Sequence, residues 1–271
     1  MKARYLWSIS AAAVLAVAQG TCLAEAGDPL TDHFSISLGT FLLNTSTDIR
    51  VDGEARTGTD LDLETDLGFD DTDRFRLDGY WRFLPRQKLR LMYFDTRRSE
   101  TTQLDRDITV GDTVFPLDAV VDTTFDTTVT TVSYEFAFLR GDKYEFAGLF
   151  GIHNLKFEFD MRAESQGQVG TLQESADANG PLPVVGLSGI WRFHDKFYLD
   201  AQVQYFRISI DPYDGRLSDY NASAVWQAFK HVGFGLGYNE FVTKVGVDGD
   251  NFDGDLRWRY GGARIFVTGS F

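Results

Sequence analysis

The clearest pattern along the chain is the alternation of apolar and polar residues between positions 73 and 94. From 74 to 83 every second residue is apolar or glycine, and the residues between them are charged or tyrosine. Because successive side chains of a β-strand point to opposite faces, this period of two predicts a strand with one apolar and one charged face. Residues 84–87 predict a short turn, and residues 88–94 continue the apolar face on a second strand.

The same alternation recurs along the whole chain, in segments of about ten residues. It predicts ten strands, near residues 33–43, 74–83, 88–94, 123–139, 144–160, 183–193, 197–210, 220–228, 232–244 and 256–271. An even number of such strands is typical of a transmembrane β-barrel, apolar towards lipid and polar towards the lumen. We therefore predict an all-β, antiparallel, up-and-down barrel of ten strands, with eight or twelve as alternatives. In 144–160 both faces contain apolar residues, so the facing of this strand stays open.

Long and short connections alternate between these strands. The five long ones are all net acidic: 45–73, 101–122, 161–182, 211–219 and 245–255. The short turns carry basic residues: Arg86, Arg140, Lys143, Lys196 and Lys230. In outer-membrane barrels the long loops are extracellular and the turns periplasmic, which predicts that both chain ends are periplasmic. Whether 45–73 adds an extracellular hairpin is left open.

Aromatic residues mark both ends of the predicted membrane-facing surface. Outward positions near the short turns hold Trp81, Phe83, Phe138, Trp191, Phe193, Phe197 and Trp226. Outward positions towards the long loops hold Tyr93, Tyr205, Tyr220 and Tyr238. Amphipathic rings at two levels predict the two aromatic girdles of a spanning barrel.

The net charge and the first 26 residues narrow the class of protein further. A formal net charge of −14 over 271 residues argues against nucleic-acid binding, which needs a basic surface. Residues 1–26 predict a secretory signal peptide: Lys2 and Arg4 precede an apolar stretch, and an A-x-A site ends at Ala26. The barrel domain would then comprise 27–271 and contain no cysteine, because Cys22 is the only one.

The last nine residues, ARIFVTGSF, alternate apolar positions and end in the aromatic Phe271. This tail is similar to the assembly signal of outer-membrane proteins, although Gly269 stands where that signal usually has tyrosine. With the strands and the leader, the whole chain resembles the small outer-membrane β-barrel proteins, a group that includes OmpA- and OmpW-like barrels. The stretch DLGFDDTDRFRLDGYWRF gives a loose local match to the OmpW-like proteins. The resemblance implies insertion by the barrel-insertion machinery through Phe271, contact with outer-membrane lipid and lipopolysaccharide, and a monomer.

The inward positions of the predicted strands carry a polar network. Its members are Arg74, Arg76, Asp78, Arg82, Arg90, Glu135, Arg192, Asp200, Gln202 and Gln204. These side chains would line a selective pore or pair across a filled lumen, and small barrels are usually packed inside. The first hypothesis is therefore porin-like passage of small solutes, and the alternative is a closed barrel that serves as surface scaffold, adhesin or envelope stabiliser.

One contact in this network can be predicted from the hairpin register. A turn centred on Arg86 places Arg82 opposite Arg90, and two like charges directly opposite are destabilising. Guanidinium groups do not lose their proton, so a carboxylate must lie nearby. Glu135, inward on the next strand, is predicted to bridge Arg90 and to reach Arg82.

Catalytic and metal chemistry find weaker support. A barrel hydrolase needs a histidine held beside a nucleophile or carboxylate. Of the four histidines only His153 falls along a strand, without such a partner in sequence, so we expect no enzyme and no cofactor. Aspartates cluster in one long loop, as weak candidates for a cation site: Asp248, Asp250, Asp253 and Asp255. A calcium loop would need an acid where Gly249 stands, so divalent cations at the acidic loops remain an alternative to plain solvated loops.

Overall fold

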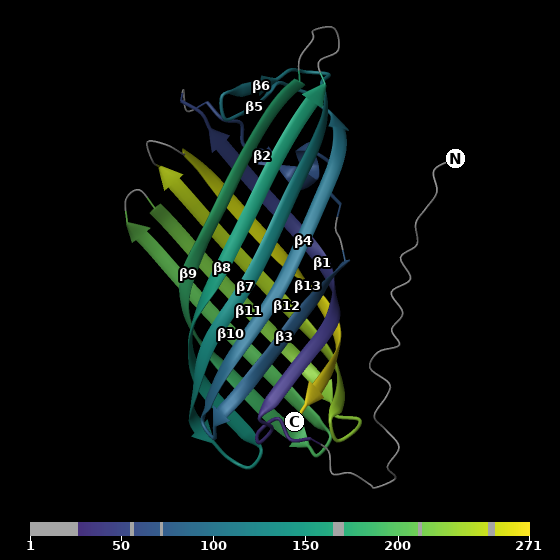
Figure 1. Ribbon diagram of the computed structural model, residues 1–271, viewed down its shortest axis with the longest axis vertical. Coiled ribbons are helices and arrows are strands. Elements are labelled where there is room, and N and C mark those ends of the chain that lie inside the picture. Colours follow the sequence, from purple (N-terminus) through teal and green to yellow (C-terminus); the bar gives the residue numbers. More distant parts are fainter. Residues whose placement is uncertain (1–26, 55–56, 71–72, 165–170, 211–212, 249–252) are drawn as a thin grey trace, which may run out of the picture.

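The computed structural model describes residues 27–54, 57–70, 73–164, 171–210, 213–248 and 253–271, which form a closed barrel of ten long antiparallel strands (Figure 1). The strands are β1 (Phe34–Asp52), β3 (Asp73–Leu84), β4 (Gln87–Gln103), β7 (Val120–Arg140), β8 (Tyr144–Glu164), β9 (Thr171–His194), β10 (Phe197–Ile210), β11 (Tyr213–Trp226), β12 (Val232–Asp248) and β13 (Asp253–Ser270). Each strand pairs with its neighbours in this order, and β13 pairs with β1. The predicted ten-stranded up-and-down barrel is confirmed. Among the described residues, no helix is long and apolar enough to cross a membrane.

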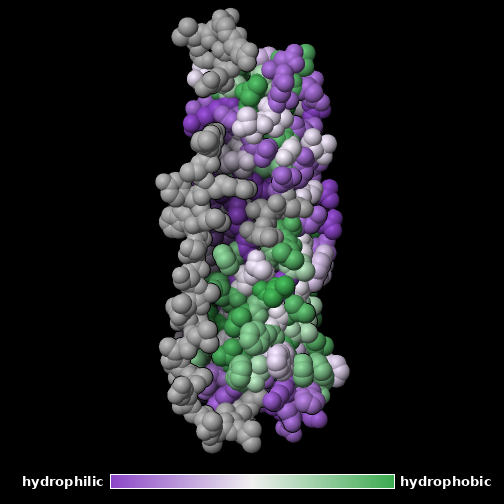
Figure 2. All heavy atoms as spheres, turned by 90° about the vertical axis from the view of Figure 1, so that its right-hand side faces the viewer, coloured by the Kyte–Doolittle hydropathy of each residue, from purple (hydrophilic) through white to green (hydrophobic). Residues whose placement is uncertain are grey.

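An apolar belt lies around the lower part of the barrel, near the end with the short turns. Figure 2 shows it on one face, and large apolar side chains are exposed on all ten long strands. On β12, for example, Phe234, Leu236 and Tyr238 are exposed, whereas Gly233 and Gly235, which alternate with them, are buried. The predicted girdle residues near the short turns, from Trp81 to Trp226, and the four tyrosines towards the long loops are all exposed on the outer surface. The facing that the alternation predicts is therefore confirmed for this belt.

Most strands continue well beyond the belt, and there the polarity of their two faces is reversed. On β8 the side chains of Leu155, Phe157 and Phe159 are buried inside, whereas Asn154 and Glu158 are exposed outside. This reversal explains why the facing of strand 144–160 is ambiguous. Its even-numbered residues are the apolar ones within the belt, and its odd-numbered residues are the apolar ones above the belt. It is the pattern of a strand that faces lipid below and water above.

Several predicted loop boundaries are wrong for the same reason. Residues 44–52, 161–164, 171–182, 213–219, 245–248 and 253–255 belong to strands rather than to loops. Their outward side chains are polar, so their composition is that of a solvated loop. The inward apolar side chains that make them strands lie in a core that the membrane pattern does not predict.

Above the belt the barrel divides into two sheets. The pairing of β1 with β3 ends at Leu42↔Asp73, and the pairing of β9 with β10 ends at Val185↔Tyr205. One sheet comprises β4, β7, β8 and β9, and the other comprises β10 to β13 and β1 (Figure 1). Their inner faces pack together, as the ring of Phe157 on β8 lies 5.3 Å from that of Trp258 on β13.

Two of the long connections fold onto this upper part. In 45–73, β2 (Leu61–Asp62) pairs with β1 and leads into the single helical turn α1 (Leu63–Asp66), rather than forming a separate hairpin. In 101–122, β5 (Ile108–Val110) and β6 (Thr113–Phe115) form a hairpin that lies over the upper end of the barrel (Figure 1).

Candidate functional site

Five charged side chains fill the lower end of the lumen. The two oxygens of Glu145 lie 2.7 Å from Arg82 Nη1 and 2.7 Å from Lys88 Nζ. Glu135 lies 3.1 Å from Lys88 Nζ and 3.0 Å from Arg90 Nε. Both carboxylates are buried and are shared among three cations. Such an arrangement satisfies buried charges that would be costly alone.

The predicted bridge between Glu135 and Arg90 is confirmed, but the predicted register is wrong. The hairpin turn is tighter than expected, with a bulge just after Arg82, so Arg82 lies opposite Lys88 rather than Arg90. The like-charge pair therefore occurs between Arg82 and Lys88, and Glu145 neutralises it. Sequence reasoning missed Glu145 because the facing of its strand was ambiguous.

The first described residues close the lower end further. The carbonyl of Pro29 accepts a hydrogen bond of 3.1 Å from Arg82 Nη2, and Asp28 lies 2.9 Å from Arg192 Nη1. Leu30 is buried. Arg192 thus belongs to the rim that holds this segment rather than to the inner network.

A second polar layer lies higher in the lumen. Asp78 lies 2.9 Å from Arg76 Nη2 and 2.5 Å from Arg264 Nη1. Arg76 also donates to Asn239, which in turn donates to Asp219 over 2.6 Å. Arg76 and Asp78, two members of the predicted polar network, thus pair with each other and are joined by residues of β11, β12 and β13 that lie far away in the sequence.

The remaining predicted lumen residues occupy different places. Asp200 lies 3.5 Å from Arg90, and Gln204 bonds the buried His153 over 3.1 Å. Gln202 lines a polar cavity of about 60 Å³. Arg74 lies at the upper end of β3 and donates to the carbonyl of Arg97.

Aromatic rings fill the lumen above these polar layers. Tyr260 lies 5.3 Å from Phe94, 5.0 Å from Phe241 and 4.8 Å from Trp258, as measured between ring centroids. Phe41 joins the same cluster at 5.7 Å from Tyr260. All five rings are almost fully buried, so the interior between the polar layers and the upper end is packed with side chains.

The gap that the short β3 leaves between β1 and β4 is filled by α1. Glu64 accepts a hydrogen bond of 2.7 Å from the backbone N–H of Thr47 on β1. The other oxygen of Glu64 lies 2.5 Å from Arg98 on β4, and Arg98 also donates to the Thr47 hydroxyl over 2.6 Å. Leu63 and Phe69 are buried beneath these contacts. Part of the acidic loop is therefore a structural element of the wall.

The β5–β6 hairpin closes the upper end. The N–H of Gly111 donates to the carbonyl of Val51 over 3.0 Å, and the Thr113 hydroxyl donates to Glu174 over 2.9 Å. These contacts join the hairpin to β1 on one sheet and to β9 on the other. Ile108 and Phe115 are buried beneath it.

The candidate cation site is only partly described. Side chains of Asp248, Asp250 and Asp253 lie outside the described residues, and Asp255 is exposed on β13. Within the described ranges, no three His, Cys, Asp or Glu side chains gather into a metal site. A divalent cation at this loop stays a prediction.

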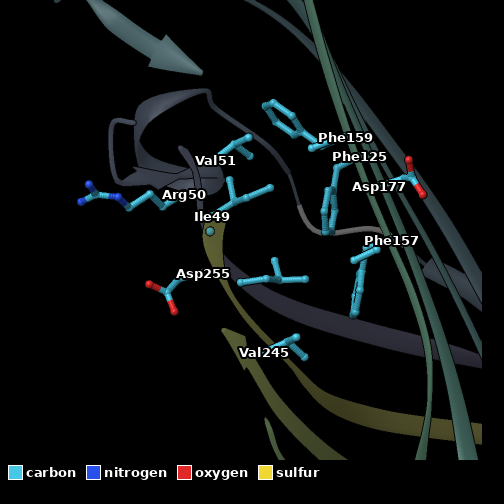
Figure 3. A pocket seen from close by; sticks show the side chains of 13 residues that line it. Ile49, Arg50, Val51, Phe125, Phe157, Phe159, Asp177, Val245 and Asp255 are labelled. Atoms are coloured by element: carbon cyan, nitrogen blue, oxygen red, sulfur yellow. The ribbon is translucent and has the colours of Figure 1, made fainter. Parts of the chain in front are cut away.

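A cleft opens between the two sheets on the side where β9 and β10 separate. Figure 3 shows Phe125, Phe157 and Phe159 of one sheet facing residues of the other. The opposing wall consists of Ile49, Val51, Val245, Gly254 and Leu256. The space between the two walls is about 50 Å³.

Charged residues surround the mouth of this cleft. Arg50 donates to Asp52 over 2.8 Å and lies 3.6 Å from Asp60. These bonds to Asp52 raise the pKa of the Arg50 guanidinium above its ordinary value. Asp255 lies across from Arg50 on the neighbouring strand, and Asp177 is exposed on β9. Two of the three charged residues that line the cleft itself, Asp177 and Asp255, are acidic. Basic groups of the adjoining outer groove, which shares Arg50 and Asp255 with the cleft, come from Arg106, Lys244 and Arg257.

Comparison with known proteins places the chain by its fold. No protein-family model matches the sequence, and no curated protein matches it. Among solved structures, the outer membrane protease OmpT of Escherichia coli is 11% identical, with a TM-score of 0.55 over 89% of this chain and 97% of that one. Ail of Yersinia pestis is 15% identical with a TM-score of 0.36, over 88% of this chain and 97% of that one. A Pseudomonas aeruginosa FadL homologue is 8% identical with a TM-score of 0.40, over 89% and 90%. The chain therefore has the fold of the bacterial outer-membrane β-barrels, without a match to a particular member.

Proposed function

We propose that this protein is an integral outer-membrane barrel whose lumen is closed to solutes and whose upper pair of sheets forms an extracellular binding surface. In this proposal the short turns and both termini face the periplasm, residues 1–26 are removed as a signal peptide, and Phe271 addresses the barrel-insertion machinery. Lipid and lipopolysaccharide would surround the belt, and the protein would act as a monomer.

The observation that carries the proposal is the continuous filling of the interior. The charge cluster around Glu135 and Glu145 is followed by the Arg76–Asp78 layer, the aromatic cluster around Tyr260 and the β5–β6 hairpin. A water-filled channel needs a continuous polar passage, as in larger barrels. Here the aromatic cluster interrupts such a passage, which favours the closed barrel over porin-like transport.

Planar-bilayer conductance of the refolded protein tests this proposal. We expect no single-channel steps from the wild-type protein. A variant in which residues 105–117 are replaced by two glycines removes the upper hairpin and is also expected to stay closed, because the aromatic cluster lies below it. Stable steps from the wild type would establish porin-like passage, and steps only from the shortened variant would establish a channel gated by the hairpin. Both results contradict a closed barrel.

An enzymatic role has less support than a binding role. His33, His194 and His231 lie near the short-turn end, and His153 is buried in the lumen with Thr131 and Gln204 as its partners. The upper sheets thus lack a histidine base. We expect no cleavage of a mixed peptide library and no change in lipid A mass when the protein is expressed. Either change would contradict a purely binding role.

A further inference from the structure

The upper part of β9 has a free edge on the side where the cleft opens. Its pairing with β8 continues up to Thr171, whereas its pairing with β10 stops at Val185. The N–H of Arg192 donates to the carbonyl of Lys143 over 2.7 Å, before β8 begins. Since backbone groups of successive strand residues point to opposite sides, the even-numbered residues of β9 bond β8, and the odd-numbered ones face β10. Above Val185 these odd-numbered residues have no strand partner among the described residues.

Two prolines agree with this assignment. Pro181 and Pro183 both occupy odd-numbered positions, where a missing N–H does not interrupt the ladder to β8. Pro183 comes two residues before the last paired residue, Val185, so the ladder to β10 ends where its donor is lost. Beyond the prolines, four residues have neither N–H nor C=O paired with another strand among the described residues: Gln173, Ser175, Asp177 and Asn179.

The inner face beside this edge is smooth and apolar. Ala176 and Ala178 lie directly opposite Phe159 and Phe157 on β8, and all four line the cleft. At Gly180 an added Cβ would meet no atom within 4 Å. A strand added along the edge would therefore find room for its inward side chains beside the alanines and against the phenylalanine rings.

From this geometry we infer that the edge of β9 and the adjoining cleft bind an extended peptide segment of another protein by strand addition. The segment would pair its backbone with residues 173–179, direct alternate apolar side chains into the cleft and carry lysine or arginine on its other face. Such addition to a sheet edge gives affinity through main-chain hydrogen bonds and specificity through alternate side-chain pockets. The inference rests on the proposed extracellular position of the upper sheets.

The charge around the cleft favours binding of a basic peptide segment over pairing with a second copy of the chain. The cleft mouth presents Asp177 and Asp255, and its one arginine, Arg50, already contacts Asp52 and Asp60. A basic segment complements this rim. Pairing of two β9 edges would bring the same acidic strand against itself, and like charges across a strand pair are destabilising.

The test uses the full mature protein in lipid nanodiscs and a defined probe. The probe is an end-blocked, fluorescent decapeptide in which valine alternates with lysine and threonine. We expect saturable binding by fluorescence anisotropy. Ser175→Pro removes an N–H that has no partner in the described part of the chain, so the variant should fold, and it should weaken binding about tenfold. Ala178→Leu fills the cleft and should weaken binding similarly, whereas Ser175→Thr keeps the N–H and should bind as the wild type does.

A second measurement does not depend on any variant. The same peptide N-methylated at alternate residues lacks the donors of one edge, and a scrambled peptide of equal composition loses the alternation. Both should bind at least about tenfold more weakly. Equal binding of the methylated peptide, equal binding by Ser175→Pro, or no saturation at about 1 mM would overturn the inference. Channel steps in the bilayer would contradict the closed lumen without changing these results, so the two proposals fail separately.

Discussion

Glu145 contacts two cations in a place that gives it almost no access to water. Arg82 and Lys88 each lie 2.7 Å from one of its oxygens, and Arg140 approaches to 3.7 Å. Each of the three cations would otherwise face a neighbouring positive charge across the hairpin or the turn. The carboxylate therefore holds the lower end of the lumen together, and its loss would leave buried charges without compensation.

Replacing Glu145 by glutamine should lower the free energy of unfolding by about 3–5 kcal/mol, the usual cost of breaking a buried ion pair from one side. Urea titration in lipid vesicles measures this change. Glu158→Gln is the matched control, because Glu158 is exposed at the upper end of the same strand and, among the described residues, forms an ion pair only with Lys156. The control should change stability by less than about 1 kcal/mol. Similar small losses in both variants would mean that water reaches Glu145.

Prediction from sequence worked for individual residues wherever the facing of the strand was clear. Glu135 and Arg90 lie in the lower parts of β7 and β4, where the alternation is clear, so their contact could be predicted. Glu145 and Arg264 were missed for different physical reasons. The first lies on a strand whose apolar parity changes halfway, and the second reaches Asp78 only because β13 closes on β1.

At the scale of elements, the short β3 makes α1 necessary. β3 ends where β1 and β4 continue upwards, and the wall between them would otherwise be open. The sequence predicts that the acidic loop 45–73 is solvated, because neither its charges nor its length indicate that Leu63, Leu67 and Phe69 are buried. The sequence does contain these apolar residues, but Arg98, whose guanidinium lies over the ring of Phe69, is on a distant strand.

Arg98 connects α1 with both flanking strands, which gives a prediction for this element. Arg98→Met removes its contacts with Glu64 and Thr47 and should cost about 1.5–3 kcal/mol, the usual value for hydrogen bonds to charged groups. It should also expose the segment around α1 to limited proteolysis. Arg97→Met is the control: the adjacent residue points outwards, is largely exposed and forms its one ion pair within the described ranges with Asp126. Equal protease sensitivity of the two variants would show that Arg98 does not hold α1 in place.

At the scale of the whole molecule, the same strands form both the apolar belt and an upper part with a polar outer face. Around the belt the outer face is apolar and the inner face polar, and above the belt both are reversed. The alternation therefore predicted the number and order of the strands, which depend on the period alone. It did not predict their length, since the rule that places apolar residues outside fails above the belt. The two-sheet division was missed with it, although Pro181 and Pro183 mark the position where it begins.

The reversal leads to a comparison within a single strand. Leu187 and Ser175 both point outwards from β9, but Leu187 lies within the belt between the girdles, and Ser175 lies well above it. Leu187→Arg should lower the free energy of unfolding in lipid vesicles by about 2–4 kcal/mol, because it places a charge near the bilayer midplane. Ser175→Arg should change it by no more than about 0.5 kcal/mol, since its surroundings are aqueous and Asp160 lies opposite. The same two variants measured in bilayers of longer acyl chains place the boundary: a thicker bilayer should leave Ser175→Arg neutral if the upper sheets stand clear of the lipid. Equal losses at the two positions would mean that lipid surrounds the whole barrel, and the upper sheets could not then form an aqueous binding surface.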